Sequence, residues 1–234
     1  MENAKQSYLI PGAILAAGVI IALAVMYVGG PNKKQAGFES KQEQAAVAGL
    51  SGEAQDLLKI QEDDFVLGNP EAPVIFVEFG DFQCPFCGRF YSTTEKEVIE
   101  KYVKTGRVKF IWRDFAFLGK ESFDAAVAAR CAGEQGKFWE YHNFLFENQN
   151  GENRGAFSLV NLKNFARSLN LDTDQFNSCL DSQKYLSAVE SETKLGGQLG
   201  VNGTPSSFIN GTHITGALPF TQFEAVIQKE LAGN

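Results

Sequence analysis

The 234-residue sequence is poor in the residues that build metal and nucleic-acid sites: it has two His and four Cys, and 28 Asp and Glu outnumber 21 Lys and Arg. The net charge of −7 argues against a protein that grips nucleic acid by its phosphates, because such binding requires a basic surface. With so few His and Cys, there are few ways to assemble a metal site. The main question is therefore whether the four cysteines act as catalysts, metal ligands or structural crosslinks.

Apolar residues make up 44% of the chain, and 20 of them are Phe. This composition excludes a disordered chain, and the length suits one or two domains. All but one of the Phe residues fall between Phe65 and Phe223, so the hydrophobic core is expected there. We predict a folded domain over residues 63–234, preceded over residues 29–62 by a polar spacer rich in Ala, Gln, Glu and Lys.

The first 28 residues contain an uncharged run from Tyr8 to Val28. As a helix this run would span roughly 31 Å, the thickness of a bilayer core. We predict a single transmembrane anchor within residues 1–28. The alternative is a cleaved signal peptide, since residues 22–24 (Ala-Leu-Ala) are of the right kind for cleavage. The apolar run continues past that site, which favours the anchor, whereas the flanking lysines do not decide the topology.

Hydrophobic periodicity in the folded part predicts an α/β domain. The apolar run at 74–79 is typical of a buried central strand, and an amphipathic helix over 85–104 leads to a second strand at 108–112. This order gives a β–α–β unit with parallel strands. The segment from 115 to 200 is then almost wholly helical, and a hairpin and a last helix follow. The predicted helices of the block cover 122–131, 137–147, 158–169 and 173–180; the hairpin strands are 206–210 and 213–216, and the last helix is 221–231.

The sequence Cys84-Pro85-Phe86-Cys87 falls at the predicted strand-to-helix junction. Proline is favoured at the first helical position, which makes Cys84 the N-cap, beside unpaired amide groups and the positive end of the helix dipole. A thiolate is stabilised there, so the pKa of Cys84 should fall below that of a free thiol. Cys87 lies one turn further on and is expected to be more buried. Cys84 is thus the candidate attacking sulfur and Cys87 its resolving partner, in dithiol/disulfide redox chemistry.

Three other uses of this pair are weighed against redox chemistry. The pair could supply half of a zinc site, but the sequence has no second Cys-x-x-Cys and His142 lies far along the chain. We therefore predict no metal. A structural disulfide across three residues constrains little. Inert reduced thiols do not suit a chain exported from the cytosol.

Three stretches of the sequence resemble the DsbA-like thiol oxidoreductases. They are Val-Glu-Phe-x-Asp-Phe-x-Cys-Pro-x-Cys at 77–87, Trp-Arg-Asp at 112–114 before the helical block, and Gly-Val-Asn-Gly-Thr-Pro at 200–205. Gln-Gly-Lys-Phe-Trp at 135–139 is similar to membrane-anchored members. The resemblance covers about residues 63–231. It implies a thioredoxin-like fold with a helical insertion domain at about 115–200, preceded here by the single N-terminal transmembrane helix.

The resemblance also assigns roles to individual residues. Thr204-Pro205 matches the family's cis-proline loop beside the cysteines, where the Thr204 backbone would pair with an extended substrate segment; an ordinary trans proline is the alternative. Glu78 matches a buried acid under the active site, and a carboxyl on an apolar strand is unusual in itself. As a hypothesis, it accepts and returns the proton of Cys87, unless it faces outward. Asp81 is expected to cap or turn the loop.

Phe86 departs from the family pattern, because the strongly oxidising members have Pro-His between the cysteines. Phenylalanine adds no charge or donor to Cys84, so the disulfide should be a weaker oxidant.

Cys131 and Cys179 lie on separate predicted helices, and some relatives carry an extra bridge in the helical domain. A structural disulfide there would close a long loop and contribute about 4 kcal/mol; buried free thiols and a redox or metal role are the alternatives.

These observations predict a membrane-tethered enzyme of the cell membrane, single-pass, with its catalytic domain outside the cytoplasm. It would introduce disulfides into exported proteins by thiol:disulfide exchange without a cofactor. A quinone-linked membrane partner would reoxidise it. A reductase or isomerase, served by a reducing partner, would use the same site. A non-catalytic metal-binding or peptide-holding chaperone domain is the alternative from another class.

Overall fold

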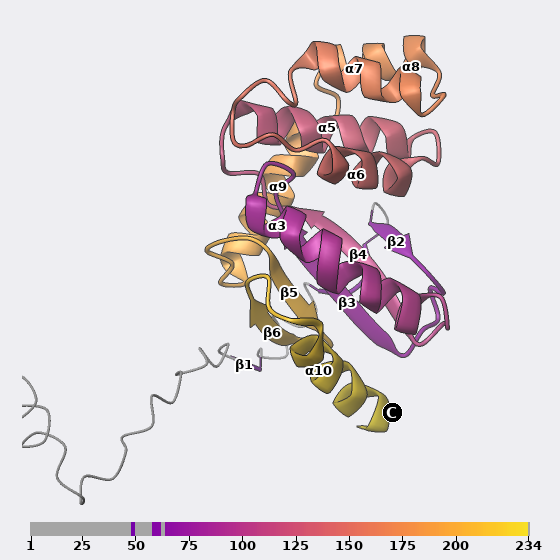
Figure 1. Ribbon diagram of the computed structural model, residues 1–234, viewed down its shortest axis with the longest axis vertical. Helices are drawn as coiled ribbons and strands as arrows, with labels where there is room; N and C mark the ends of the chain where they lie inside the picture. The colour runs from indigo at the N-terminus through magenta and orange to yellow at the C-terminus, as the bar shows by residue number, and fades with distance from the viewer. Residues whose placement is uncertain (1–47, 50–57, 62–63, 234) are drawn as a thin grey trace, which may run out of the picture. The chain divides into compact units, whose positions relative to one another are not determined.

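The computed structural model describes residues 48–49, 58–61 and 64–233, and the predicted anchor over residues 1–28 lies outside these ranges. A six-stranded sheet in the order β1-β6-β5-β3-β4-β2 forms the base of the domain (Figure 1). Its strands are β1 (Ala48–Gly49), β2 (Phe65–Leu67), β3 (Val74–Gly80), β4 (Val108–Asp114), β5 (Ser206–Ile209) and β6 (Thr212–Thr215). β3 and β4 are parallel, as predicted, and the other neighbouring strands pair antiparallel.

The central strand β3 is buried on both faces, which explains its unbroken apolar sequence. Alternate residues belong to two different cores. Val74 and Phe76 pack under the helices on one face, whereas Val77 and Phe79 join the core on the other. Glu78 has the same parity as Phe76 and therefore points toward the face covered by the helix that carries the cysteines.

The predicted helix 85–104 is a continuous helical segment with two π-helical stretches. It runs through α3 (Pro85–Phe90), η1 (Tyr91–Glu95), α4 (Lys96–Val98) and η2 (Ile99–Val103). Its buried face includes residues at helical spacing, namely Phe90, Thr94, Val98 and Tyr102. The C-terminal helix α10 (Phe220–Gly233) packs beside this segment on the same face of the sheet, in one core with it.

The expected helical block lies between β4 and β5, and it shares its core with Cys84 and Cys87 of the active-site segment and with Trp112 of β4. In Figure 1 α5, α6, α7 and α8 stand above the sheet, and α9 leads back toward β5. Their bounds are α5 (Lys120–Gly133), α6 (Phe138–Glu147), α7 (Leu159–Ser168), α8 (Thr173–Asp181) and α9 (Leu186–Gln198). Asp172 caps α8 and accepts hydrogen bonds from the amides of Asp174 and Gln175.

Three elements of the fold were not predicted individually: the strand β1, which lies within the predicted spacer, the strand β2 and the separate helix α9. β2 has three residues, too few for a periodic pattern, and it forms because β4 offers it an edge. In addition, Leu58 in the predicted spacer is buried in the core beside Val77.

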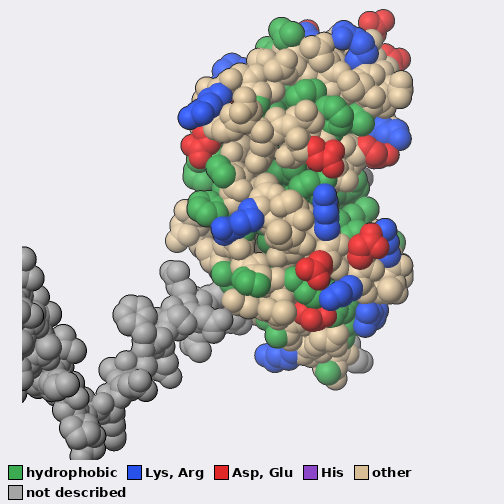
Figure 2. All heavy atoms as spheres, viewed as in Figure 1, with side chains coloured by type: hydrophobic (Ala, Val, Ile, Leu, Met, Phe, Trp, Pro, Cys, Tyr) green, Lys and Arg blue, Asp and Glu red, His purple; other side chains and the backbone are tan. Residues whose placement is uncertain are grey.

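Across the described residues, every helix is too short or too polar to cross a bilayer. On the face seen in Figure 2, basic and acidic side chains are interspersed.

Candidate active site

Cys84 is the N-cap residue of α3, as the sequence predicted. Its φ of −68° and ψ of 120° are extended, and Pro85 occupies the first helical position. The preceding turn is fixed by Asp81, whose carbonyl accepts from the Cys84 amide at 2.9 Å and whose Oδ1 accepts from the Gln83 amide at 2.8 Å. Asp81 thus caps the loop as expected. The Cys84 sulfur is left beside the first amides of the helix, where negative charge is stabilised.

Both thiols of the Cys-x-x-Cys pair are free and shielded from solvent. Cys84 is 5% exposed and Cys87 is fully buried, whereas Phe86 between them is 55% exposed. The Cys84 thiol donates to the carbonyl oxygen of Thr204 at 3.4 Å, and the Thr204–Pro205 peptide bond is cis. The fold therefore brings the predicted loop at Thr204-Pro205 against Cys84 across 120 residues of sequence.

The surroundings move the pKa values of the two thiols in opposite directions. A hydrogen bond from Cys87 lowers the pKa of Cys84 to about 6, opposed by burial and helped by Thr204 and by the amides of Cys87 and Phe86. Burial raises the pKa of Cys87 well above its ordinary value, and the Cys84 sulfur adds to that shift. One sulfur is therefore a thiolate near neutral pH and the other a thiol, the division of labour that exchange requires.

Glu78 is directly opposite Ser207 in the pairing of β3 with β5, six residues before Cys84. Its side chain is fully buried, and neither carboxyl oxygen has a hydrogen-bond partner among the described residues. Burial, followed by the charges of Glu95 and Cys84, raises the pKa of Glu78 well above its ordinary value. This shift favours the protonated carboxyl, a form that can give up a proton and take it back.

The helical block supplies two contacts to the active-site loop that the sequence did not reveal, one from the side chain of Gln149 and one from the backbone of Asn153. Gln149 Nε2 donates to the carbonyl oxygens of Phe82 at 2.5 Å and of Cys84 at 3.2 Å. The Asn153 amide donates to Gln83 Oε1 at 2.5 Å. Both lie in the irregular segment 148–158, where periodicity gives no signal. Gly88 in the first turns of a helix was the available hint, because glycine there costs stability unless something approaches closely.

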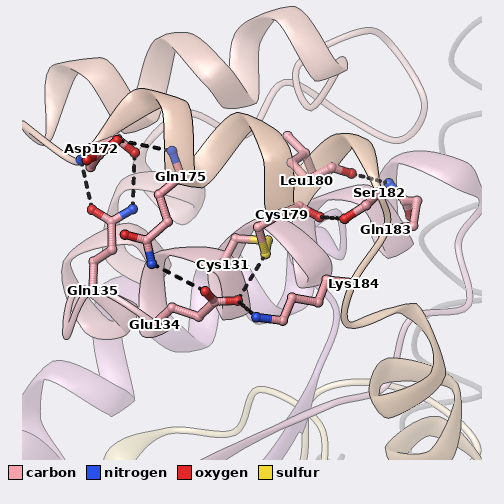
Figure 3. Close-up of a disulfide and its surroundings, with 10 residues drawn as sticks. All are labelled: Cys131, Glu134, Gln135, Asp172, Gln175, Cys179, Leu180, Ser182, Gln183 and Lys184. Atoms are coloured by element: carbon pink, nitrogen blue, oxygen red, sulfur yellow. Dashed lines mark hydrogen bonds and ion pairs between the residues drawn. A yellow bond between two sulfur atoms is a disulfide. The ribbon is translucent and has the colours of Figure 1, made fainter.

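Cys131 of α5 and Cys179 of α8 are joined by a disulfide with a Cα–Cα distance of 5.8 Å (Figure 3). Polar contacts reinforce the same two helices beside it. The Gln135 side chain exchanges two hydrogen bonds with the Asp172 backbone, at 2.8 and 3.1 Å. Gln175 Nε2 donates to Glu134 at 3.3 Å. The bridge is therefore part of the packing of the insertion.

The described residues contain no group of three or more His, Cys, Asp or Glu arranged to hold a metal ion. Taken together, the sheet order, the helical insertion between β4 and β5, and the Cys-x-x-Cys pair at a helix N-terminus define a thioredoxin-fold protein with a dithiol site.

Comparison with known proteins agrees with this class. A family model described as thioredoxin matches residues 60–229. The chain is 30% identical over 172 residues to disulfide bond formation protein D of Bacillus subtilis, covering 72% of this chain and 78% of that one. This chain belongs to the thioredoxin family, and within it to the DsbA-like proteins.

Two solved structures show the same architecture. Oxidised BdbD from Bacillus subtilis superposes with a TM-score of 0.69 at 28% identity, covering 80% of this chain and 98% of that one. Wolbachia pipientis alpha-DsbA1 gives a TM-score of 0.70 at 25% identity, covering 77% and 96%. The chain also matches the Na⁺/H⁺ antiporter NhaA 1 of Salinispora arenicola, 33% identical over 193 residues, but it spans only 28% of that protein's length.

Proposed function

We propose that this protein is a thiol:disulfide oxidoreductase that introduces disulfides into exported proteins through Cys84 and Cys87. The observation that carries the proposal is the geometry of the pair: Cys84 is at the helix N-cap against the cis Thr204–Pro205 loop, and Cys87 is buried one turn further on. In keeping with this, the pKa of Cys84 is lowered to about 6 and burial raises that of Cys87. Such a pair makes Cys84 both a good nucleophile near neutral pH and a good leaving group. A relative named disulfide bond formation protein D, and others named putative protein-disulfide oxidoreductases, support the same chemistry.

In the oxidising direction, a substrate thiolate attacks the Cys84 sulfur of the Cys84–Cys87 disulfide. The bond between the two cysteines breaks, a mixed disulfide forms, and Cys87 leaves as a thiolate. A second substrate thiolate then attacks the substrate sulfur of the mixed disulfide and expels Cys84 as a thiolate. The substrate has lost two electrons and gained a disulfide, and the enzyme is left as the reduced pair.

Glu78 serves the step in which Cys87 is expelled. The buried Cys87 thiolate is unfavourable, since burial raises the pKa of this thiol. In the proposal, the neutral carboxyl of Glu78 gives its proton to the Cys87 sulfur, and takes it back when Cys87 attacks during reoxidation. The Thr204 backbone beside Pro205 pairs with an extended substrate segment and holds the substrate sulfur near Cys84.

We place the enzyme at the cell membrane, with its catalytic domain outside the cytoplasm. The uncharged run from Tyr8 to Val28 supports a single-pass anchor, and the bridge between Cys131 and Cys179 suits an oxidising compartment. A quinone-linked membrane partner would reoxidise the Cys84–Cys87 pair. An anchored domain would remain near such a partner.

One observation favours a second direction, that of a reductase or isomerase with a reducing partner. The exposed Phe86 offers Cys84 no donor or positive charge of its own, and Arg89 lies over the Phe86 ring at 5.0 Å. With less thiolate stabilisation the reduced form is less favoured, so the disulfide is a weaker oxidant. In that direction Cys84 attacks a substrate disulfide and Cys87 resolves the mixed disulfide.

The equilibrium of the Cys84–Cys87 pair with reduced and oxidised glutathione decides the direction. We expect the pair to be fully reduced by glutathione buffers that leave a structural disulfide intact, as suits an oxidase. A pair that stays oxidised in a strongly reducing glutathione buffer would overturn the oxidase and support the reductase. The Cys131→Ala/Cys179→Ala variant provides the matched control, because only the active-site pair can then titrate.

A further inference from the structure

The loop at Thr204-Pro205 continues into a hydrogen bond that the proposed mechanism does not use. The hydroxyl oxygen of Ser206 lies 2.5 Å from Nε2 of His213, across the hairpin of β5 and β6. Ser206 is only 1% exposed, so its hydroxyl cannot reach a substrate and the pair is not a catalytic dyad. Its effect must therefore be on the position of the loop.

Three consecutive residues of this loop are each held by a hydrogen bond. The carbonyl oxygen of Thr204 accepts from the Cys84 thiol at 3.4 Å, and that of Pro205 accepts from the Gly216 amide at 2.8 Å. The third contact is the side-chain hydrogen bond of the next residue to β6. The strand β6 and the residue that follows it thus supply two of the three contacts that hold the loop beside Cys84.

The burial of Ser206 fixes the direction of its hydrogen bond. Among the described residues, His213 is the only hydrogen-bond partner of the Ser206 hydroxyl. A buried hydroxyl proton without an acceptor costs free energy, so the hydroxyl donates and Nε2 of His213 accepts. A neutral imidazole that accepts at Nε2 carries its proton on Nδ1. The contact therefore specifies one of the two neutral forms of His213.

The surroundings of His213 favour a neutral imidazole. Its ring stacks on that of Phe208 with the centroids 4.3 Å apart, and its strand partners, Phe208 of β5 and Ala48 of β1, are uncharged. Two charged side chains lie near the hairpin: Lys59 lines a hollow with Phe208, and Glu230 of α10 accepts from the hairpin turn at 3.2 Å. Neither contributes to the lowered pKa of His213, whose cause is burial.

We propose that His213 is a positioning residue for disulfide exchange: as a neutral acceptor of the Ser206 hydroxyl, it holds the Thr204-Pro205 loop in place for the substrate segment. Protonation of Nε2 turns the bond around, because the imidazolium then donates to Ser206 and the buried hydroxyl proton loses its acceptor. The loop should therefore bind substrate less well as pH falls through the titration midpoint of His213. The inference rests on the proposed function, since it needs a substrate segment paired with this loop.

The hydrogen bond is tested first without any reaction, by NMR of the histidine ring nitrogens in the reduced, full-length protein at mildly alkaline pH. The signals of His213 are assigned by their loss in His213→Phe. We expect its proton on Nδ1, and on Nε2, the form that free histidine prefers, in Ser206→Ala. Ser207→Ala is the matched control and should leave the proton on Nδ1, because the buried Ser207 hydroxyl has no hydrogen-bond partner among the described residues. A proton on Nε2 in the wild-type protein, or an unchanged ring in Ser206→Ala, would overturn the inference.

The kinetics of exchange give the second readout, with oxidised protein and an excess of a peptide that bears two thiols. His213→Phe keeps a ring to stack on Phe208 but removes the acceptor. The peptide concentration at half-maximal rate should rise about three- to tenfold at mildly alkaline pH, the effect of one hydrogen bond, with little change in the maximal rate. In the wild-type protein this concentration should rise as pH falls through the His213 midpoint, so the two proteins should converge at low pH.

Two further variants separate the hydrogen bond from general damage to the fold. Ser206→Ala removes the other partner, so it should give the same rise, and Ser206→Ala/His213→Phe should add nothing further. His213→Gln, whose carboxamide oxygen can accept in place of Nε2, should restore binding at every pH. If wild-type protein exchanges no disulfides, the proposed function fails whatever the form of His213. If wild-type protein exchanges but the half-maximal concentration is unchanged in both His213→Phe and Ser206→Ala, only the inference about His213 fails.

Discussion

Cys84 and Cys87 carry the same chemical group three residues apart, but their positions in one helix shift the pKa values of the two thiols in opposite directions. Cys84 stands at the helix N-cap, where hydrogen bonds from Cys87 and from the first amides of the helix favour its thiolate, and Cys87 is one turn deeper, where burial favours its thiol. These shifts arise from position, because neither depends on a nearby positive side chain. At this scale the site follows from the N-terminal geometry of one helix.

The pH dependence of thiol modification tests this assignment. The reduced Cys84 thiol should react with iodoacetamide with a half-maximal rate near pH 6, because the pKa of Cys84 is lowered to about 6 and the thiolate is the nucleophile. As pH falls through 6 the thiolate fraction, and with it the rate, is lost. Stopped alkylation followed by mass spectrometry gives the profile.

Two variants test whether the alkylation midpoint belongs to Cys84 and depends on Cys87. In Cys87→Ala the midpoint should rise, since the largest cause of the lowered pKa of Cys84 is the hydrogen bond from Cys87. In Cys84→Ser the buried Cys87 should be unreactive at neutral pH. A midpoint near 9 in the reduced wild-type protein would contradict the assignment.

Whether a residue of the site could be predicted from the sequence depends on whether its role is decided by its neighbours in the chain. Cys84 and Pro85 could be predicted because helix capping is decided within one turn. Glu78 stood out as a charge within an apolar strand, and Asp81 as a turn residue. The contacts of Gln149 and His213 could not be predicted, because a loop position and a hairpin position acquire their meaning only from the partner that the fold places beside them.

At the scale of elements, the active-site helix and the helical block meet at Gly88. A Cβ added to Gly88 would lie 2.3 Å from Gln149 Oε1, too close for both to keep their positions. Gln149 holds the carbonyls of Phe82 and Cys84 from this side. The glycine therefore makes room for a side chain that fixes the loop before the helix.

Gly88→Ala should displace the Gln149 amide and loosen the turn at Cys84, as should Gln149→Ala. We expect each variant to lower the free energy of unfolding by about 1–3 kcal/mol and to raise the pKa of Cys84. Because both changes remove the same contacts, the double variant should cost clearly less than the sum of the two. Urea unfolding and the iodoacetamide profile measure the two effects.

Gly197→Ala is the matched control, since a Cβ there meets nothing within 4 Å on helix α9. It should stabilise the protein by up to about 1 kcal/mol through helix propensity. Fully additive effects of Gly88→Ala and Gln149→Ala would show that Gln149 does not act through this contact.

Elements were predictable where their pattern is long. The strand at β3 and the helices α5 to α8 are periodic or continuous over many residues, and each was expected near its observed place. The strand β2 depends on the edge of β4, and the π-helical stretches depend on how the helix fits the sheet. Tertiary contacts decide such features, so local pattern cannot show them.

At the scale of the whole molecule, one interaction holds the helices of the helical block together and another joins the block to the sheet. The disulfide between Cys131 and Cys179 joins α5 to α8. The buried Arg130 of α5 bridges Asp114 of β4 and Glu192 of α9, at 2.6 Å each. The first links two helices within the insertion, and the second links the insertion to the sheet that carries the site.

Removing the bridge in Cys131→Ala/Cys179→Ala should lower the free energy of unfolding by about 2–4 kcal/mol, because the crosslink closes a loop with a sequence separation of 48. Thiol exchange through Cys84 should persist under native conditions, since the proposed reaction does not involve this bridge. Urea unfolding under non-reducing conditions measures the loss, with Cys84→Ser/Cys87→Ser as the control that keeps the bridge. Complete loss of exchange in a folded Cys131→Ala/Cys179→Ala protein would show that the bridge belongs to the catalytic machinery.

The central claim is that Cys84 exchanges disulfides with a protein thiol pair. Its most direct test is a single-turnover reaction of the oxidised protein with an equimolar peptide bearing two thiols, quenched by acid and analysed by intact mass. We expect the peptide to gain a disulfide as the Cys84–Cys87 pair becomes reduced, and Cys84→Ser to abolish the transfer. A peptide that stays reduced beside the oxidised wild-type protein, or that is oxidised equally by Cys84→Ser, would contradict it.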